Sequence, residues 1–405
     1  SDTVGVAAAV TVNWVTVRTL ARTADGLTID VGGVFAVLAS NEVDATARAT
    51  GSAVKLQNGS NIGAAVALNV VNSTNRGSIG SGSRVTAGQI AVTGLTPAGA
   101  RNDFQGWAVA AAGGTSDTSV AGAVAVQALL LTNEAVIGAG STLTVTDGIS
   151  MDASNPMALS GIAASGAITL DGNGVGAAIV VQYVTSTTRA VIESSFLAPT
   201  VISAGGAIIG RATASLDPLA APEIPLLGSL GDFTGVAVAG AAANGDAAVG
   251  GSVIVNVVNR TTEAGLGDAA SVNQGVAGTA LAPGGDLSFT ATDQTRFIDV
   301  AGALGLSTGS AGIGFALALN VQNKNVRAFI GRGVAADLGG SVWLIATAGE
   351  HFTAFAISGG AADDVGIGGS FVVLVLNQGA SAPGTRAVID SSADAPTSVR
   401  ARGAM

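Results

Sequence analysis

One stretch of this chain recurs along its length, and this repetition limits the possible folds more than any other feature. The clearest copy, residues 61–80, reads NIGAAVALNVVNSTNRGSIG. Other copies are AGAVAVQALLLTNEAVIG at 121–138, GVGAAIVVQYVTSTTRAVIE at 174–193, VGGSVIVNVVNRTTEAGLG at 249–267 and GIGFALALNVQNKNVRAFIG at 312–331, with weaker copies from Gly5 and Gly366. Internal repeats of this length predict a stack of equivalent units.

Small and large residues alternate inside each copy. In residues 64–70 the larger aliphatic side chains occupy every second position, and Ala or Asn occupies the positions between them. A period of two predicts a β-strand. Because both faces are apolar over the first half of the motif, we expect both to be buried. The polar second half, such as residues 72–76, should reach solvent on one side.

Two further strand segments are expected in each repeat. A shorter one follows a Gly turn, as in residues 88–93 and 340–346, and an Ala/Gly-rich one follows it, as in residues 107–113 and 355–360. The sequence therefore predicts an all-β fold, a parallel β-solenoid or β-helix with seven coils of about 55 residues and three strand segments per coil. The alternative is a stack of antiparallel hairpin repeats, since Asn-Gly and Asp-Gly turns also suit hairpins.

The repeats divide the chain without leaving room for a second domain. The predicted boundaries of this single array, residues 1–405, are about 5–60, 61–118, 119–173, 174–246, 247–310, 311–364 and 365–405. Residues 215–231, with three of the nine prolines, and residues 268–283 lengthen their repeats and are expected to form loops outside the array. Because the chain starts and stops inside a repeat, we expect it to be part of a longer polypeptide.

A side-chain amide occupies the same motif position in six copies. These residues are Asn13, Asn69, Gln127, Gln182, Asn256 and Asn320, and Leu374 takes the position in the last copy. In a stack of coils, equivalent residues lie one strand spacing apart, so these amides are expected to form a structural ladder in which each donates to one neighbour and accepts from the next. The alternative is a row of solvent-facing amides with no such bonding.

Composition narrows the possible partners. Aromatic residues make up only 4% of the chain, charged residues 11%, and 59 residues are Gly, which suits sheets that approach closely. A net charge of −10 disfavours nucleic acid and anionic membranes as partners. No run of 18 apolar residues is free of polar or turn residues, so no membrane-spanning segment is expected. Without cysteine, stability must come from burial and backbone pairing.

Catalytic and metal-binding patterns are weak. Residues 305–309, GLSTG, match a nucleophile motif, but that motif needs a strand-turn-helix context and a His partner, for which only His351 is present. Asp363 with Asp364, and Asp171 with Asn173, could hold Ca²⁺ at turns, although solvated turns are the preferred interpretation. Enzymes that act on polysaccharides with a β-helix need paired carboxylates. We therefore expect no enzyme, no catalytic residue and no cofactor.

The motif GAAVALNVVN…IG, followed by a strand of the form Gly-Ile-x-Val, resembles the repeat regions of large bacterial surface and secreted proteins. These are filamentous adhesins of the leukotoxin-like and haemagglutinin-like kind. The resemblance implies an extracellular or cell-surface location and a structural, adhesive stalk. It implies as partner either another copy of the chain, through end-to-end or lateral association, or a host or cell-surface ligand. The alternatives are a self-assembling filament or matrix subunit and a polysaccharide-active enzyme.

Overall fold

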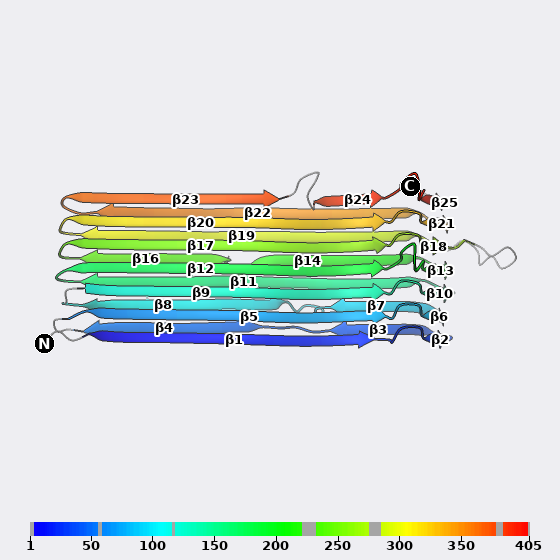
Figure 1. Cartoon of the computed structure of the whole chain (residues 1–405), viewed down its shortest axis with the longest axis horizontal. Helices are drawn as coiled ribbons and strands as arrows, with labels where there is room; N and C mark the ends of the chain where they lie inside the picture. The colour runs from blue at the N-terminus through cyan, green and yellow to red at the C-terminus, as the bar shows by residue number, and fades with distance from the viewer. Residues whose placement is uncertain are drawn as a thin grey trace.

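A computed structural model describes residues 4–55, 59–115, 118–220, 232–274, 285–377 and 384–403. The longest strands stack side by side in one sheet, here called sheet A (Figure 1). In stacking order its strands are β1 (Gly5–Arg22), β5 (Asn61–Ile79), β9 (Thr118–Ile137), β12 (Asn173–Ile192), β17 (Ala247–Leu266), β20 (Ala311–Ile330) and β23 (Val365–Asn377), and β24 (Thr385–Ile389) also pairs with β20. This order is the order of the motif copies in the sequence.

Two further sheets complete each coil. Sheet B is short, with the order β2 (Thr28–Asp30), β6 (Arg84–Ala87), β10 (Thr142–Val145), β13 (Val201–Ala204), β18 (Ser271–Val272), β21 (Ala335–Leu338) and β25 (Ser398–Ala401). Sheet C contains β3 (Val34–Ser40), β4 (Ala45–Lys55), β7 (Gln89–Leu95), β8 (Asn102–Gly114), β11 (Ile149–Thr169), β14 (Ile208–Ala220), β15 (Asp232–Phe233), β16 (Gly235–Ala243), β19 (Leu287–Ser307) and β22 (Val342–Ala361). The chain runs along sheet A, turns through sheet B and returns along sheet C (Figure 1).

The predicted parallel β-solenoid is confirmed. Each motif copy pairs with its equivalents in the coils before and after it, without a slip in register, so that Gly5 lies opposite Asn61 and Asn61 opposite Ser119. Among the strand pairs of the described residues, only β14 with β15 is antiparallel. The alternative of stacked antiparallel hairpins is therefore wrong, because the turns at the coil ends connect different sheets instead of neighbouring strands.

The strand segments are distributed differently from the sequence expectation. Both segments predicted after the motif belong to sheet C, and they form one continuous strand in β11, β19 and β22. The third sheet of the coil is instead the short sheet B, whose strands have two to four residues. Segments this short carry too little periodicity to stand out in a sequence.

The proline-containing insertion begins later than predicted. Residues 215–220 belong to β14, where Leu216 is fully buried and Pro218 lies opposite Leu159 of β11. This start of the predicted loop is therefore part of sheet C, and the rest of it, 221–231, lies outside the described residues. Similarly, Ser271–Val272 of the second predicted loop forms β18.

The cross-section of each coil has two unlike halves. We call "narrow half" the region where residues 5–14 of β1 and their equivalents in sheet A face residues 47–55 of β4 and their equivalents in sheet C. We call "wide half" the remainder, including sheet B. The interior of the narrow half is a cluster built mainly of Ala, whereas the interior of the wide half holds Ile, Leu, Val, Met and Phe. The aliphatic residues that close each motif, from Ile79 to Ile330, are buried in the wide half.

Backbones of the two sheets nearly touch in the narrow half. A Cβ added to Gly63 of β5 would lie 2.0 Å from the carbonyl oxygen of Ala111 in β8. At Gly314 of β20 the corresponding distance, to the oxygen of Gly359 in β22, is 2.3 Å. Since real Cβ contacts are longer than this, only Gly fits at these two positions, and the rest of the narrow-half interior is mainly Ala, with Val180 and Ile254 as larger exceptions. This spacing explains the Ala/Gly-rich face of the motif.

Candidate functional site

The six amide residues form one file along the stack. Asn13 lies opposite Asn69, Asn69 opposite Gln127, and the file continues through Gln182, Asn256 and Asn320 to Leu374. The amide side chains from Asn69 to Asn320 are buried at the inner edge of the narrow half. These five buried amides have a structural position and cannot contact a ligand outside the solenoid.

Hydrogen bonding in the file differs from the expected ladder. Only two bonds between its members follow the stack in the described residues, Asn13 Nδ2 to Asn69 Oδ1 at 2.9 Å and Asn256 Nδ2 to Asn320 Oδ1 at 2.8 Å. Gln127 and Gln182 instead donate across the interior to backbone carbonyls of sheet C and of the segment before β16, those of Ser160 at 2.6 Å and Thr234 at 2.7 Å. The amides therefore tie opposite walls together more than they tie neighbouring coils.

Glycines in sheet C make room for the longer amides. Gly106 of β8 and Gly161 of β11 are in register with one another, and they face Gln127 and Gln182. A Cβ on Gly161 would lie 2.6 Å from Nε2 of Gln182, so Gly is required at this position, whereas a Cβ on Gly106 would lie 3.4 Å from Gln127, an ordinary contact.

One acid interrupts this small-residue column. Asp299 of β19 is in register with Gly235 and Ala354 and is fully buried. Its Oδ2 accepts a hydrogen bond of 2.9 Å from Nδ2 of Asn256. Burial raises the pKa of Asp299 to about 7, against the opposing effect of hydrogen bonds from Asn320 and Asn256. In the described part of the chain no Arg or Lys forms a salt bridge with Asp299, so no opposite charge stabilises its ionised form.

A second buried acid, in the wide half, is fully paired. Asp293 lies 3.1 Å from Nε of Arg260 and 3.1 Å from Nζ of Lys324, and all three side chains are buried. Lys324 also lies 3.0 Å from Glu350, and Thr262 donates to Asp293 at 2.8 Å. This network joins sheets A and C inside the solenoid. The network was not predicted from the sequence, although Lys324 is four residues from Asn320 and therefore lies on the same inward side of β20.

Charges on the outside of the wide half alternate over five successive coils. Arg76, Glu134, Arg189, Glu263 and Arg327 occupy one column of sheet A, and Arg386 follows Arg327 in the last coil with the same sign. Glu134 lies 3.5 Å from Arg76 and 3.3 Å from Arg189, and Arg189 lies 3.4 Å from Glu263. Alternating signs favour the observed order of coils, because residues two coils apart carry the same charge. If one coil were skipped, two like charges would lie side by side.

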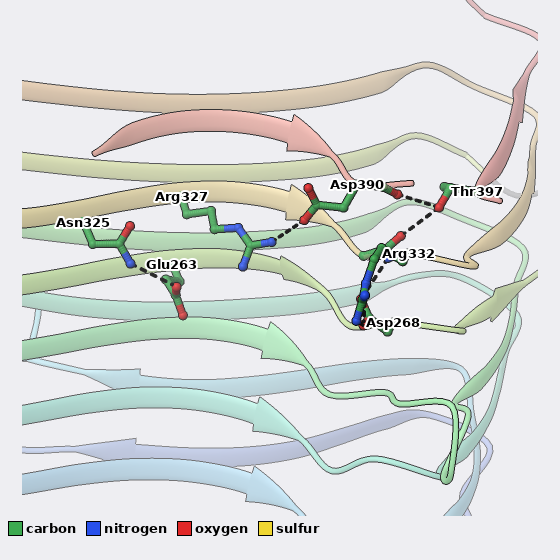
Figure 2. A network of polar contacts seen from close by, with 8 residues as sticks. Glu263, Asp268, Asn325, Arg327, Arg332, Asp390 and Thr397 are labelled. Carbon is green, nitrogen blue, oxygen red and sulfur yellow. Dashed lines mark hydrogen bonds and ion pairs between the residues drawn. The ribbon is translucent and has the colours of Figure 1, made fainter. Parts of the chain in front are cut away.

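Figure 2 shows polar contacts around Glu263 and Arg327 of this column and at the turn toward sheet B. Asn325 donates to Glu263 at 3.3 Å, and Arg327 approaches Asp390 at 2.5 Å. At the turn, Arg332 lies 2.7 Å from Asp268. Burial tends to raise the pKa of Asp268, but hydrogen bonds and the charge of Arg332 outweigh it and hold that pKa below its ordinary value. These contacts connect successive coils.

The residues considered for catalysis do not meet. Ser307 ends β19 and donates to the carbonyl oxygen of Gly245, and no helix follows it. His351 of β22 lies opposite Arg296, 11 residues from Ser307 along β19, which corresponds to about 36 Å along a strand. A Ser–His pair is therefore excluded. The described residues contain no group of three or more His, Asp or Glu able to hold a metal ion, and Asp171 and Asp363 lie at turns of different coils.

The most extensive feature of the surface is apolar. In the narrow half the large residues of sheet A point outward, on a surface we call face A: alternate residues of Val6–Trp14 in β1 and their equivalents up to Ile367–Val375 in β23. Trp14 is 76% exposed and Val10 68%. The expectation that both faces of the motif are buried is wrong, because the second wall of the coil covers only the small-residue side.

Sheet C carries a similar but less regular surface. Its outward residues in the narrow half include Val109, Ile168, Val238, Leu304 and Phe355. A shallow groove of about 350 Å³ lies among them and is lined by Val109, Ile162, Phe233, Val236, Val238 and Val300. In the first coil, however, β4 places Arg48 and Thr50 on this side, so the apolar surface of sheet C does not extend over the whole stack.

Comparison with known proteins identifies no relative: no family model matches the chain, and neither a curated protein nor a solved structure matches it significantly. No helix of the described residues has the length and apolarity needed to cross a membrane.

Proposed function

We propose that the chain is a structural and adhesive repeat protein of the bacterial surface, whose coils form a rigid panel. The observation that carries this proposal is the in-register stack of sheet A, in which each long strand pairs with its neighbours over nearly its full length. Continuous pairing of this kind resists bending between coils. The resemblance of the repeats to those of filamentous adhesins supports an extracellular location.

The dimensions of the coil suit a protein that presents a broad surface better than one that serves as a long spacer. One coil uses about 55 residues but advances the stack by only about 4.8 Å, while a strand of 20 residues spans about 66 Å. A chain selected as a spacer would gain far more length per residue from narrower coils. A coil with strands of this length presents broad faces, and an adhesive panel needs broad faces.

Display of the chain on a non-adherent bacterium tests the proposal. Attachment to abiotic surfaces and to epithelial cells should rise several-fold over cells that display an unrelated β-solenoid at the same density. Protease resistance of the displayed chain would establish that it is folded. Folded display without any gain in attachment would contradict the proposal.

The alternative of a polysaccharide-active enzyme is tested separately. Release of reducing ends from uronic-acid and neutral glycans should stay at background. Turnover that disappears in a carboxylate variant would replace the adhesive proposal with an enzymatic one.

A further inference from the structure

Face A is large, flat and uncharged. Five outward positions on each of the seven stacked strands make up this face, and none carries an Asp, Glu, Lys or Arg. Six strand spacings of about 4.8 Å by four two-residue steps of about 6.7 Å give an area of about 800 Å². Typical monomers keep their largest apolar patch to about 300–600 Å². A surface above that range indicates a partner that covers it.

The shape of face A suits a second sheet. One column, running from Ala8 through Ala64 and Gly122 to Gly369, consists of small residues except at Phe315. It forms a trough between two columns of larger side chains, which begin at Val6 and Val10. Ridges and a trough that run parallel to the stack allow a ridge of one copy to lie in the trough of another. Flat sheets pack face to face in this way about 10 Å apart.

The surroundings of face A set its limits. Toward the wide half the outer surface becomes polar, with Thr185, Thr187 and Arg189 following Tyr183 along β12. Beyond the other edge lie turns with Asp171, Asp246 and Asp363. An apolar centre with a polar rim is the composition of specific protein interfaces.

We propose that face A pairs with face A of a second copy of the chain, as an isologous dimer interface. Two such faces bury about 1,600 Å² in total, the size of a standard stable interface. An uncharged face meets its own copy without like-charge repulsion, whereas the outer charge column of the wide half would not. This inference concerns a contact in solution and does not depend on the adhesive function proposed above.

Sedimentation equilibrium over about 0.1–100 µM chain tests the proposal. We expect a dimer at low micromolar concentration. Val181→Lys, on the central strand β12 and one outward position from the centre of face A, should raise the dimer Kd by at least about 100-fold, since it places an unpaired charge in a desolvated interface. Thr187→Lys, six residues further along the same strand and on the same side, is the matched control and should change Kd less than about threefold.

Two further measurements separate the alternatives. Val238→Lys on the outer side of sheet C should leave the dimer intact, and an unchanged circular dichroism spectrum and Tm should show that all three variants fold. A wild-type chain that stays monomeric at 100 µM would overturn the proposal, as would a dimer broken by Val238→Lys and not by Val181→Lys. A monomer that binds phosphatidylcholine vesicles through Val181 would also overturn it and would assign face A to lipid.

Discussion

The two halves of the coil use the same strands in opposite ways. In the wide half, sheets A, B and C surround large aliphatic side chains, and charged and polar residues cover the outside. In the narrow half, two sheets lie so close that mainly Ala, Gly and a file of amides fit between them, with Val180 and Ile254 as the larger exceptions, and most large aliphatic residues are on the outside. A single 20-residue strand such as β9 passes from one arrangement to the other without a break.

This difference shows that burial in a solenoid depends on the distance between its walls. Sheet B separates sheets A and C at one end of the coil, so large side chains are needed there to fill the space. Nothing separates them at the other end, so the small-residue face closes inward and the large-residue face becomes a surface. The high hydrophobic content of the chain, 48%, is therefore divided between a core and an exterior.

The two buried aspartates offer the sharpest contrast, and the larger effect is expected in the wide half. Asp293→Asn should lower the free energy of unfolding by about 3–5 kcal/mol, because Arg260 loses its buried carboxylate and Lys324 loses one of the two carboxylates that it contacts. Urea unfolding would measure the loss. Asp152→Asn, a partly exposed acid 3.6 Å from Arg211, is the control and should cost less than about 1 kcal/mol. Equal effects would mean that the wide-half network is hydrated.

The same substitution at Asp299, in the narrow half, should have the opposite sign. Because its folded pKa of about 7 exceeds the ordinary value of 3.8, the folded chain binds the proton more tightly than the unfolded chain. Its contribution to stability therefore falls as pH rises from about 4 to about 8, by up to roughly 4 kcal/mol.

Asp299→Asn removes this dependence. The variant should be more stable than the wild type at pH 8 by a few kcal/mol, with the difference shrinking toward pH 4. Urea midpoints at several pH values would record it. If the wild type and the variant differed in free energy of unfolding by the same amount at pH 4 and at pH 8, Asp299 would not be protonated in the folded chain.

Substitutions should have different effects on the two faces of one strand. Replacing Ala67 or Ala318, both fully buried in the narrow half, with Leu should cost about 1–3 kcal/mol or more, because the opposite wall cannot retreat without breaking its own strand pairs. Leu68→Thr on the neighbouring outward position should cost less than about 1 kcal/mol in the monomer. Thermal unfolding at low concentration would compare them, and a tolerated Ala67→Leu would mean that the walls are further apart.

Loss of one amide should have the smallest of these effects. Asn69 Nδ2 donates to the carbonyl oxygens of Gln105 at 2.7 Å and Ala45 at 3.3 Å. Asn69→Leu leaves these acceptors and the amide of Asn13 with fewer partners and should cost about 1–3 kcal/mol. Amide hydrogen exchange should rise in β4 and β8, which lie across the interior, and in β1. A rise confined to β1 and β9 would instead favour a ladder along the stack.

The sequence was sufficient to predict the stacking because that property depends on repetition. Equivalent residues such as Asn13 and Asn320 must align once each coil contains one motif. The inward direction of Ala67 was not predictable from the strand alone, since alternation assigns residues to two faces without saying which one meets the second wall. The Gly column at Gly63 and Gly314 held that information, because Gly is needed only where backbones approach.

The interior polar residues were harder to predict for a different reason. Asp293, Arg260 and Lys324 come from different strands, and their contact depends on how sheet C lies over sheet A. Ser307 and His351 do not meet for another reason, since both lie on sheet C but far apart along its strands. Composition and motif spacing hold no such information across the two walls.

Single-cysteine accessibility tests the inside-out narrow half most directly, because the chain has no cysteine of its own. Four variants on β9 suffice: Ala125→Cys and Val126→Cys in the narrow half, and Leu131→Cys and Thr132→Cys in the wide half. At concentrations below dimer formation, Val126→Cys and Thr132→Cys should react with maleimide at rates near those of a free thiol, and Ala125→Cys and Leu131→Cys should be protected by at least about 100-fold. Protection of Val126→Cys together with rapid reaction of Ala125→Cys would contradict the account.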